Sequence, residues 1–241
     1  AARLPSPRDQ PSRSPSRGER WLWLLHDDAV PAPDALQALL AVAARTPSAG
    51  VLGPKLRAWG RRQGGPRMLQ EVGVTLSRSG RRDTGLDLPE LDQGQYDQVR
   101  DVLAVSRAGM LIRADVWDEL GGYDPALPVC GDDVDFCWRA RLAGYRVLVV
   151  PDAVLMHAAA ASRGARPLAL ALPGPRFLAH RWGFQARRAG CYMLLANRPW
   201  WSLPVTTVVV LLSGLLHVLA ALAVKDVGRG ADELVGPLSV L

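Results

Sequence analysis

The segment GDDVDFCWRARLAGYRVLVVPDAVLMH, residues 131–157, decides the fold. It begins with an acidic turn and continues with a short helical pattern that Gly144 is placed to end. The next residues, Tyr145–Val150, are nearly all apolar, which is typical of a strand buried on both faces of a sheet. Pro151 is expected to end that strand. A helix followed directly by a buried strand indicates an α/β layered domain.

Three acidic residues, Asp132, Asp133 and Asp135, lie at the start of the predicted helix. The free N–H groups and the positive dipole end of a helix N-terminus stabilise carboxylates there. One acid is enough to cap a helix, so three acids suggest an additional chemical role. The alternative interpretation is that all three simply start the helix, where acids are common.

A second acidic turn, His26-Asp27-Asp28, follows the apolar strand pattern WLWLL at residues 21–25. Closely spaced carboxylates at the end of a strand can hold a hard divalent cation that bridges a diphosphate. The alternative is a solvated turn. His157, which follows the second apolar strand, either contributes an imidazole nitrogen to the same metal or has a structural role.

The remaining elements are predicted from apolar periodicity and turn residues. They alternate between strand and helix, which supports the α/β assignment. They are a helix over 34–45, a strand over 51–56, a hairpin over 71–82, a polar loop over 84–101, strands over 102–105 and 110–113, and a helix over 115–120.

A charge-free apolar stretch over 203–224 is about 33 Å long as a helix, enough to cross the hydrocarbon layer of a membrane. It predicts a transmembrane helix, with a buried core helix as the alternative. The segment over 161–202 is rich in arginine and tryptophan and is predicted to be juxtamembrane; a tail over 225–241 follows. The arginines before the span favour a cytoplasmic location for the globular part.

The first 20 residues are rich in proline, serine and arginine and are predicted to form a flexible arm or linker. This arm carries half of the net charge of +6. A basic nucleic-acid-binding module is therefore a possible interpretation of the charge alone. No aromatic residues for base stacking are interleaved with these arginines, so we expect no nucleic-acid partner.

Three segments in order, LLHDDAVP at 24–31, SRAGMLIRADVWDELGGYD at 106–124 and the segment at 131–157, resemble the second half of a family 2 glycosyltransferase. The resemblance covers about residues 21–157. It implies a partial GT-A domain, an α/β fold with a mixed sheet, over 21–160, followed by the transmembrane helix. Nothing before Trp21 resembles the strand and helix with which family members hold the nucleoside, so we expect an N-terminally truncated domain.

The family resemblance assigns a role to each acidic turn. Its Asp-x-Asp motif matches His26, Asp27 and Asp28, so histidine replaces the first acid and Asp28 keeps the main metal position, with Asp27 beside it. His157 matches a histidine that some members use as a metal ligand. The family's Glu-Asp pair matches Asp132-Asp133, with Asp133 as the general base. Further candidates for contacts with the donor or acceptor are His26, Arg107, Gly109 and Arg139.

This resemblance implies an inverting hexosyltransferase that moves a sugar from a nucleotide-sugar to a membrane-associated acceptor of the cell envelope, lipid-linked or polysaccharide. A divalent cation, Mn²⁺ or Mg²⁺, would neutralise the leaving diphosphate, while a carboxylate deprotonates the acceptor hydroxyl. The alternative function is a non-catalytic membrane scaffold with a degenerate transferase domain. The sequence does not specify the sugar, the acceptor or the oligomeric state.

Overall fold

The computed structural model describes residues 19–59, 67–86, 90–160 and 181–240. The predicted arm therefore lies outside the described residues except for its last two, as does the 161–180 part of the predicted juxtamembrane segment. The chain forms two compact units. The first unit comprises residues 1–75, 84–122 and 136–158, and the second comprises 76–83, 123–135 and 159–241.

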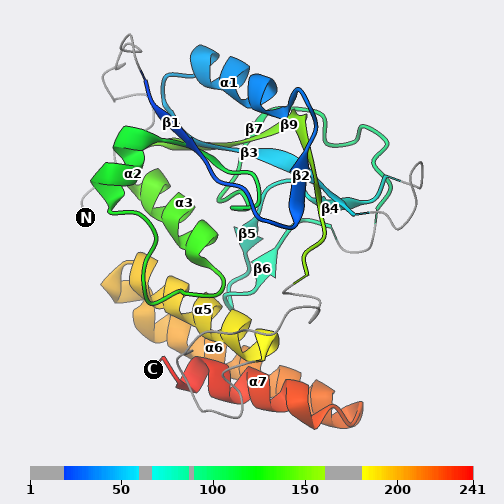
Figure 1. Ribbon diagram of the computed structural model, residues 1–241. Coiled ribbons are helices and arrows are strands. Elements are labelled where there is room, and N and C mark those ends of the chain that lie inside the picture. The colour runs from blue at the N-terminus through cyan, green and yellow to red at the C-terminus, as the bar shows by residue number, and fades with distance from the viewer. Residues whose placement is uncertain (1–18, 60–66, 87–89, 161–180, 241) are drawn as a thin grey trace. The chain divides into compact units, whose positions relative to one another are not determined.

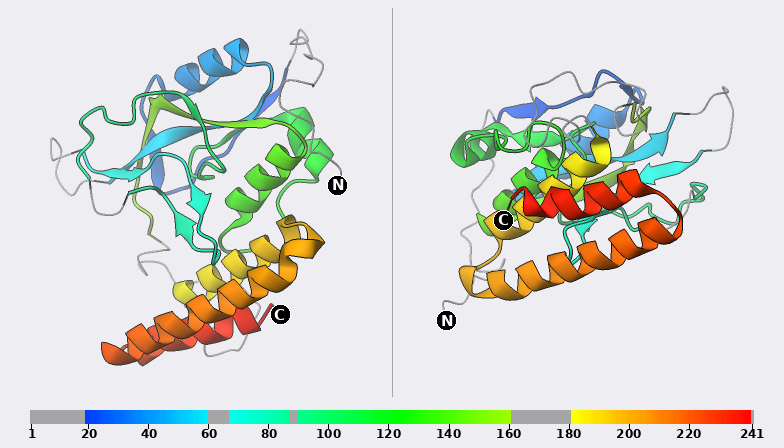
Figure 2. Two further views of the ribbon diagram at one scale, coloured as in Figure 1. Left: turned by 180° about the vertical axis from the view of Figure 1, so that it is seen from behind. Right: turned by 90° about the horizontal axis from the view of Figure 1, so that it is seen from below.

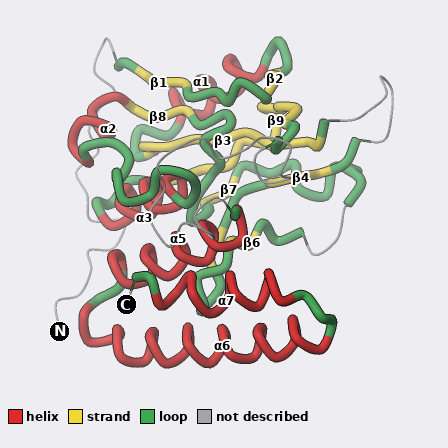
Figure 3. The backbone as a smooth tube through the Cα atoms, turned by 60° about the horizontal axis from the view of Figure 1, so that its bottom comes forward, coloured by secondary structure: helices red, strands yellow, loops and turns green. Residues whose placement is uncertain are grey.

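The first unit is built on a mixed, seven-stranded sheet (Figures 1 and 3). Its main path runs β1-β8-β3-β9-β2, with β4 paired to β3 and β7 paired to β9. The central pair, β3 and β9, is parallel, and the other pairs are antiparallel. The predicted α/β class is thereby confirmed. The strands are β1 (Trp21–Trp23), β2 (Ala29–Pro31), β3 (Ala49–Ala58), β4 (Leu69–Glu71), β7 (Arg100–Asp101), β8 (Leu111–Arg113) and β9 (Arg146–His157).

One helix, α1 (Ala35–Arg45), packs its apolar face on β3 and β9 (Figure 1). Its buried residues recur with the helical period seen in the sequence, and Leu39 is fully buried. They join sheet residues such as Leu52 and Leu155 in one apolar core. Helix α2 (Ala114–Leu120) follows β8 and ends, as predicted, at Gly121, whose φ of 70° is left-handed.

Strand β9 passes through Pro151, where the sequence predicted its end. The register between the two parallel strands shifts here, between the Pro54–Val150 pair and the Lys55–Val154 pair. Pro151 lies in this bulge and has no partner in the ladder, so its missing N–H group removes no ladder hydrogen bond. The prediction of a strand end at this proline is therefore wrong.

No strand forms over residues 102–105, all of which the structure describes, so the strand predicted there is also wrong. The short strand β7 pairs with β9 just before it, and Ala104 forms an isolated bridge with Val74. The sequence analysis missed strand β2, which directly follows the acidic turn at His26–Asp28. Three residues are too few for a clear alternating pattern.

The second unit contains a hairpin and a group of helices. The hairpin consists of β5 (Thr75–Leu76) and β6 (Arg82–Asp83), and the helices are α5 (Trp182–Asn197), α6 (Leu203–Ala223) and α7 (Val227–Leu238), with a 3₁₀ turn, η1 (Trp200–Ser202), before α6. Helix α7 packs against both α5 and α6 (Figure 2). A Cβ atom at Gly190 would lie 1.9 Å from the carbonyl oxygen of Gly80, so glycine is needed where α5 meets the hairpin.

The acidic residues of α7 face this helix group and pair with arginines. Glu233 is buried and lies 2.9 Å from Arg187 of α5 and 2.5 Å from Arg81 of the hairpin. Asp232 accepts two hydrogen bonds from Arg181, at 2.8 and 3.0 Å. These ion pairs join α7 to α5 and to the hairpin.

Helix α6 is the apolar helix predicted from the sequence. Within the described residues, the stretch Trp200–Ala223 is the one helical stretch long and apolar enough to cross a membrane. One side of α6, including Thr206 and Val210, is buried, whereas Val205 is 67% exposed and Leu216 is 66% exposed. A core helix of a soluble protein would be mostly buried. Helix α6 is therefore a candidate membrane-spanning helix.

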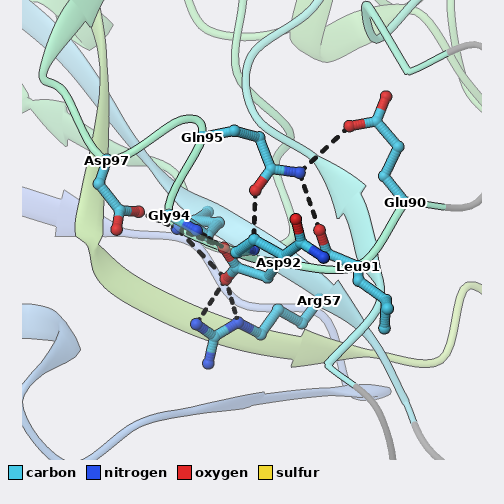
Figure 4. A network of polar contacts seen from close by, with 9 residues as sticks. Arg57, Glu90, Leu91, Asp92, Gly94, Gln95 and Asp97 are labelled. Atoms are coloured by element: carbon cyan, nitrogen blue, oxygen red, sulfur yellow. Dashed lines mark hydrogen bonds and ion pairs between the residues drawn. The ribbon is translucent and has the colours of Figure 1, made fainter.

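A buried polar network holds the polar loop that precedes β7 (Figure 4). Lys55 of β3 is almost fully buried and pairs with Asp92 at 3.1 Å and with Asp97. Arg57 Nε donates to Asp92 Oδ2 at 2.7 Å, and the backbone N–H of Gly94 donates to Asp92 Oδ1 at 3.3 Å. Burial alone would raise the pKa of Asp92, but the hydrogen bonds from Arg57, Lys55 and Gly94 outweigh it and hold this pKa below its usual value.

Replacing Asp92 with asparagine is expected to lower the free energy of unfolding by about 2 kcal/mol at pH 7, because hydrogen bonds to a charged group are lost. The folded-state pKa of Asp92 is lowered, so its contribution is present above the unfolded-state pKa and is lost as the pH falls through the folded-state pKa. Urea unfolding at pH 7 and at about pH 2 measures this, with the exposed Asp152→Asn as the control. An equal difference in the free energy of unfolding between the wild-type protein and Asp92→Asn at both pH values would contradict this prediction.

Candidate functional site

The first unit brings together three of the predicted site residues. His26 and Asp28 lie in the turn between β1 and β2, and His157 is the last residue of β9. Strand β2 pairs with β9 so that Ala29 lies opposite His157, and the N–H of Ala158 donates to the carbonyl of Asp28 at 3.0 Å. The pairing of β2 with β9 therefore places the acidic turn beside the histidine.

The ligand atoms of His26, Asp28 and His157 all lie within 4.8 Å of one another, and we call these residues the His-Asp-His cluster. His157 Nε2 is 3.4 Å from Asp28 Oδ1 and 3.4 Å from His26 Nδ1. The side chains of Asp28 and His157 are 12% and 11% exposed, so water reaches them little. A carboxylate and imidazoles at this spacing fit a divalent metal ion. Asp27 is exposed and is not part of the cluster.

Arg107 also reaches this cluster. Its Nε donates a hydrogen bond to His26 Nε2 at 2.9 Å. This contact places the loop before β8 beside the acidic turn. A guanidinium at this position is suited to contact phosphate oxygens.

Gly109, predicted to contact the donor or acceptor, lies in the same loop but is buried. A Cβ atom there would lie 2.6 Å from Leu155 and 2.7 Å from Pro54, so the close packing of the loop on β3 and β9 requires glycine. Its carbonyl accepts a hydrogen bond from Trp23 Nε1 at 3.3 Å. These contacts explain the glycine by packing, and a role in ligand binding stays a prediction.

Arg139, another predicted contact residue, lies on helix α3 (Asp132–Leu142). Its two terminal nitrogens donate to the carbonyls of Leu120 and Gly122, each at 2.8 Å. These carbonyls lie at the C-terminal end of α2, where a cation is favoured by the helix dipole. The contacts give Arg139 a structural role, and a role in ligand binding stays a prediction.

In the second unit, α3 begins with the predicted acidic residues. Asp132 and Asp133 are 4% and 5% exposed. Arg82 Nη1 lies 3.1 Å from Asp133 Oδ1 and 3.0 Å from Asp133 Oδ2, and the N–H of Val134 donates to Oδ1 at 2.8 Å. The carboxylate of Asp133 is therefore held at the helix start by a guanidinium and a backbone N–H.

The third acid of the segment has a structural partner. Asp135 Oδ1 accepts a hydrogen bond from Asn197 Nδ2 at 2.8 Å, which joins α3 to the end of α5. Nearby, Tyr192 donates from its hydroxyl to Asp124 at 2.6 Å, and this bond, with burial, raises the pKa of Tyr192 to about 12. The hydrogen bond from Asn197 therefore gives Asp135 a structural role.

The sequence analysis missed Arg82 and Asn197 as partners of these acids. Arg82 belongs to the predicted hairpin, but its residue type alone does not distinguish it from an exposed arginine. Asn197 lies 62 residues after its partner and carries no motif. Contacts at such separations depend on tertiary packing that no local pattern reveals.

Comparisons with known proteins agree with the predicted family. The family described as "Glycosyltransferase like family 2" matches residues 13–171. The O-antigen biosynthesis protein RfbC of Myxococcus xanthus is 33% identical over 153 residues, which are 61% of this chain and 12% of that protein. The N-acetylglucosaminyl-diphospho-decaprenol L-rhamnosyltransferase of Mycobacterium tuberculosis is 26% identical over 200 residues, 78% of this chain and 61% of that protein.

A solved structure, described as GalNAc-T7 with UDP, GalNAc and Mn²⁺, is 18% identical with a TM-score of 0.44, and the match covers 57% of this chain and 27% of that chain. The chain spans between 12% and 61% of the lengths of the two curated relatives. The family match covers the whole sheet domain, from β1 to β9, and well over half of the chain. The chain therefore belongs to the glycosyltransferase-like family 2, with the GT-A type of α/β domain expected for it.

Proposed function

We propose that this chain transfers a sugar, with inversion, from a nucleotide-sugar to a membrane-associated acceptor of the cell envelope, assisted by a divalent metal ion. The observation that carries the proposal is the His-Asp-His cluster in a chain of this family. The names of the relatives point in the same direction, since one belongs to O-antigen biosynthesis and the other uses a lipid-linked diphosphate sugar.

Asp28 and His157 are the residues that would hold the cation, Mn²⁺ or Mg²⁺, with Asp27 as a further predicted ligand. The bound ion would neutralise the negative charge that develops on the leaving nucleoside diphosphate. Arg107 adds a fixed positive charge next to this cluster. It would strengthen binding of the diphosphate without taking part in bond making.

Asp133 is the proposed general base. The acceptor oxygen attacks the anomeric carbon, the bond from that carbon to the diphosphate breaks, and Asp133 takes the hydroxyl proton. A single displacement of this kind inverts the anomeric configuration. Arg82 would orient the carboxylate of Asp133, and Asp132 occupies the position of the family's other acid.

The membrane part of the proposal rests on α6 and the residues before it. The exposed face of α6 is apolar, and Trp200 and Trp201, which precede it, are 82% and 69% exposed. Tryptophans are enriched where a membrane meets water. We propose that α6 anchors the chain in the cell membrane with the catalytic domain in the cytoplasm, close to a lipid-linked or polysaccharide acceptor.

A non-catalytic membrane scaffold is the second candidate. Two observations favour it. Arg82 pairs with the proposed base, and His26 replaces the first acid of the metal motif. A scaffold of this kind would still attach to membranes but would not turn over a sugar donor.

The experiment that separates these functions uses the complete protein in detergent with Mn²⁺. Radiolabelled UDP-glucose, UDP-galactose, UDP-N-acetylglucosamine and dTDP-L-rhamnose are each offered with decaprenyl-diphosphate-linked N-acetylglucosamine as acceptor. Transfer of label to the lipid fraction, abolished by EDTA, is the expected result, and the anomeric coupling in the NMR spectrum of the product reports inversion. Absence of both donor binding and transfer for all four sugars would favour the scaffold.

A further inference from the structure

The histidine that replaces the first acid of the metal motif has both ring nitrogens engaged. On one side, Arg107 Nε lies 2.9 Å from His26 Nε2. A guanidinium N–H group can only donate, so His26 Nε2 must accept this hydrogen bond through its lone pair. In a neutral imidazole the proton then resides on the other nitrogen, Nδ1.

The surroundings of His26 Nδ1 agree with this assignment. His157 Nε2 lies at 3.4 Å and Asp28 Oδ1 lies at 3.7 Å. A carboxylate oxygen is an acceptor, and an imidazole nitrogen accepts when it is unprotonated. An N–H at His26 Nδ1 would thus point toward two acceptors. Arg107, His26 and His157 form a directed chain of hydrogen bonds that begins at the guanidinium.

This hydrogen-bond direction conflicts with metal ligation by His26. A histidine binds a metal through the lone pair of one nitrogen, and the hydrogen bond made by the other nitrogen fixes which one is free. If His26 Nδ1 bound the metal, the proton would move to Nε2 and would face the N–H of Arg107. The hydrogen bond from Arg107 and metal binding by His26 Nδ1 therefore exclude each other.

From this geometry we infer that Arg107 fixes His26 as a hydrogen-bond donor of the site and prevents it from acting as a metal ligand. Asp28 and His157 would hold the divalent cation, and the His26 Nδ1–H group would donate a hydrogen bond to an oxygen of the donor's diphosphate. Arg107 is thus a positioning residue that sets the role of His26. The inference rests on the proposed metal-assisted transfer, although the hydrogen-bond direction itself does not need the metal.

The first experiment reads the position of the proton on His26 directly, without metal. Two-bond ¹⁵N–¹H correlation spectra of the protein with ¹⁵N-labelled histidine distinguish the two neutral tautomers, and His26→Gln identifies the signals. We expect a protonated Nδ1 in the wild-type protein and loss of this preference in Arg107→Met. A wild-type His26 with its proton on Nε2 would overturn the inference.

The second experiment measures Mn²⁺ affinity by electron paramagnetic resonance in the wild-type protein, His26→Ala, Arg107→Met and the double variant. We expect His26→Ala to bind Mn²⁺ within about twofold of wild type and Arg107→Met to bind it about tenfold more tightly, because His26 Nδ1 can then act as a further ligand. Loss of the positive charge of Arg107 accounts for part of the gain in Mn²⁺ affinity. When Arg107→Met is introduced into His26→Ala, only this charge effect remains. The gain from Arg107→Met in the wild-type protein, compared with its gain in His26→Ala, therefore reports the contribution of His26 as a new ligand.

The outcomes are distinct from those that test the proposed function. A tenfold weaker Mn²⁺ affinity in His26→Ala would make His26 a ligand and would overturn the inference. Equal gains from Arg107→Met in both backgrounds would also overturn it, because charge alone would then explain the effect. If the wild-type protein binds no Mn²⁺, the metal-assisted function fails, and the tautomer spectra still decide the role of Arg107.

Discussion

Asp133→Asn is expected to lower the turnover of sugar transfer by at least about 100-fold, because a neutral amide cannot take the proton of the acceptor hydroxyl. The fold should be retained. The amide oxygen of asparagine can still accept the hydrogen bond that the N–H of Val134 donates to Asp133 at 2.8 Å. Arg82 loses its ionic partner, but its side chain is 35% exposed and is hydrated by solvent.

Initial rates of transfer to the lipid acceptor and the thermal unfolding temperature together check this prediction. The control is Asp152→Asn, the same chemical change at an exposed residue of β9. Arg82→Met separates positioning from catalysis, since it should lower turnover while leaving a measurable rate, because the carboxylate of Asp133 is still present. Transfer by Asp133→Asn at a near wild-type rate would remove Asp133 as the base.

The sequence predicted the elements that carry the site better than it predicted how they pair. The strand over 21–25, the helix over 34–45 and the acidic helix start at Asp132 all correspond to observed elements. Each has a strong local signal, such as an apolar period or a capping residue. Their order also carried the family resemblance, which the family match confirms.

The sequence did not predict the contacts that complete the His-Asp-His cluster. Strand β2 is too short to show a period, and β9 continues past Pro151 only because a bulge in its pairing with β3 accommodates the proline. Both features depend on neighbouring strands. They nevertheless bring Asp28 beside His157. The prediction that these two residues share a metal came from motif order, whereas their contact arises from the pairing of β2 with β9.

The sequence also did not predict the side-chain partners of Arg107 and Arg82. The sequence predicted a contact with the donor or acceptor for Arg107, but the hydrogen bond from Arg107 to His26 links residues 81 positions apart. Arg82 pairs with Asp133 across 51 positions. An arginine is most often exposed to solvent, and only the folded structure selects these two as partners of site residues.

Asp28→Asn is expected to weaken Mn²⁺ binding by more than about tenfold and to lower turnover at a fixed low Mn²⁺ concentration by about 100-fold. Asp28 supplies the one carboxylate of the His-Asp-His cluster, and its Oδ1 lies 3.4 Å from His157 Nε2. An amide oxygen is a neutral and weaker ligand for a hard cation. The backbone carbonyl of Asp28 still accepts from Ala158 in the variant, so the pairing of β2 with β9 should persist.

The matched control for this prediction is Asp27→Asn, an identical change at the adjacent, exposed residue. Because Asp27 is not part of the cluster, its variant should lose less affinity for Mn²⁺ than Asp28→Asn does. A role in metal binding also predicts that excess Mn²⁺ restores part of the activity of Asp28→Asn, whereas it should not restore Asp133→Asn, which lacks the base. A greater loss of Mn²⁺ affinity in Asp27→Asn than in Asp28→Asn would identify Asp27 as the main metal ligand. Full Mn²⁺ affinity in Asp28→Asn would show that Asp28 is not a ligand.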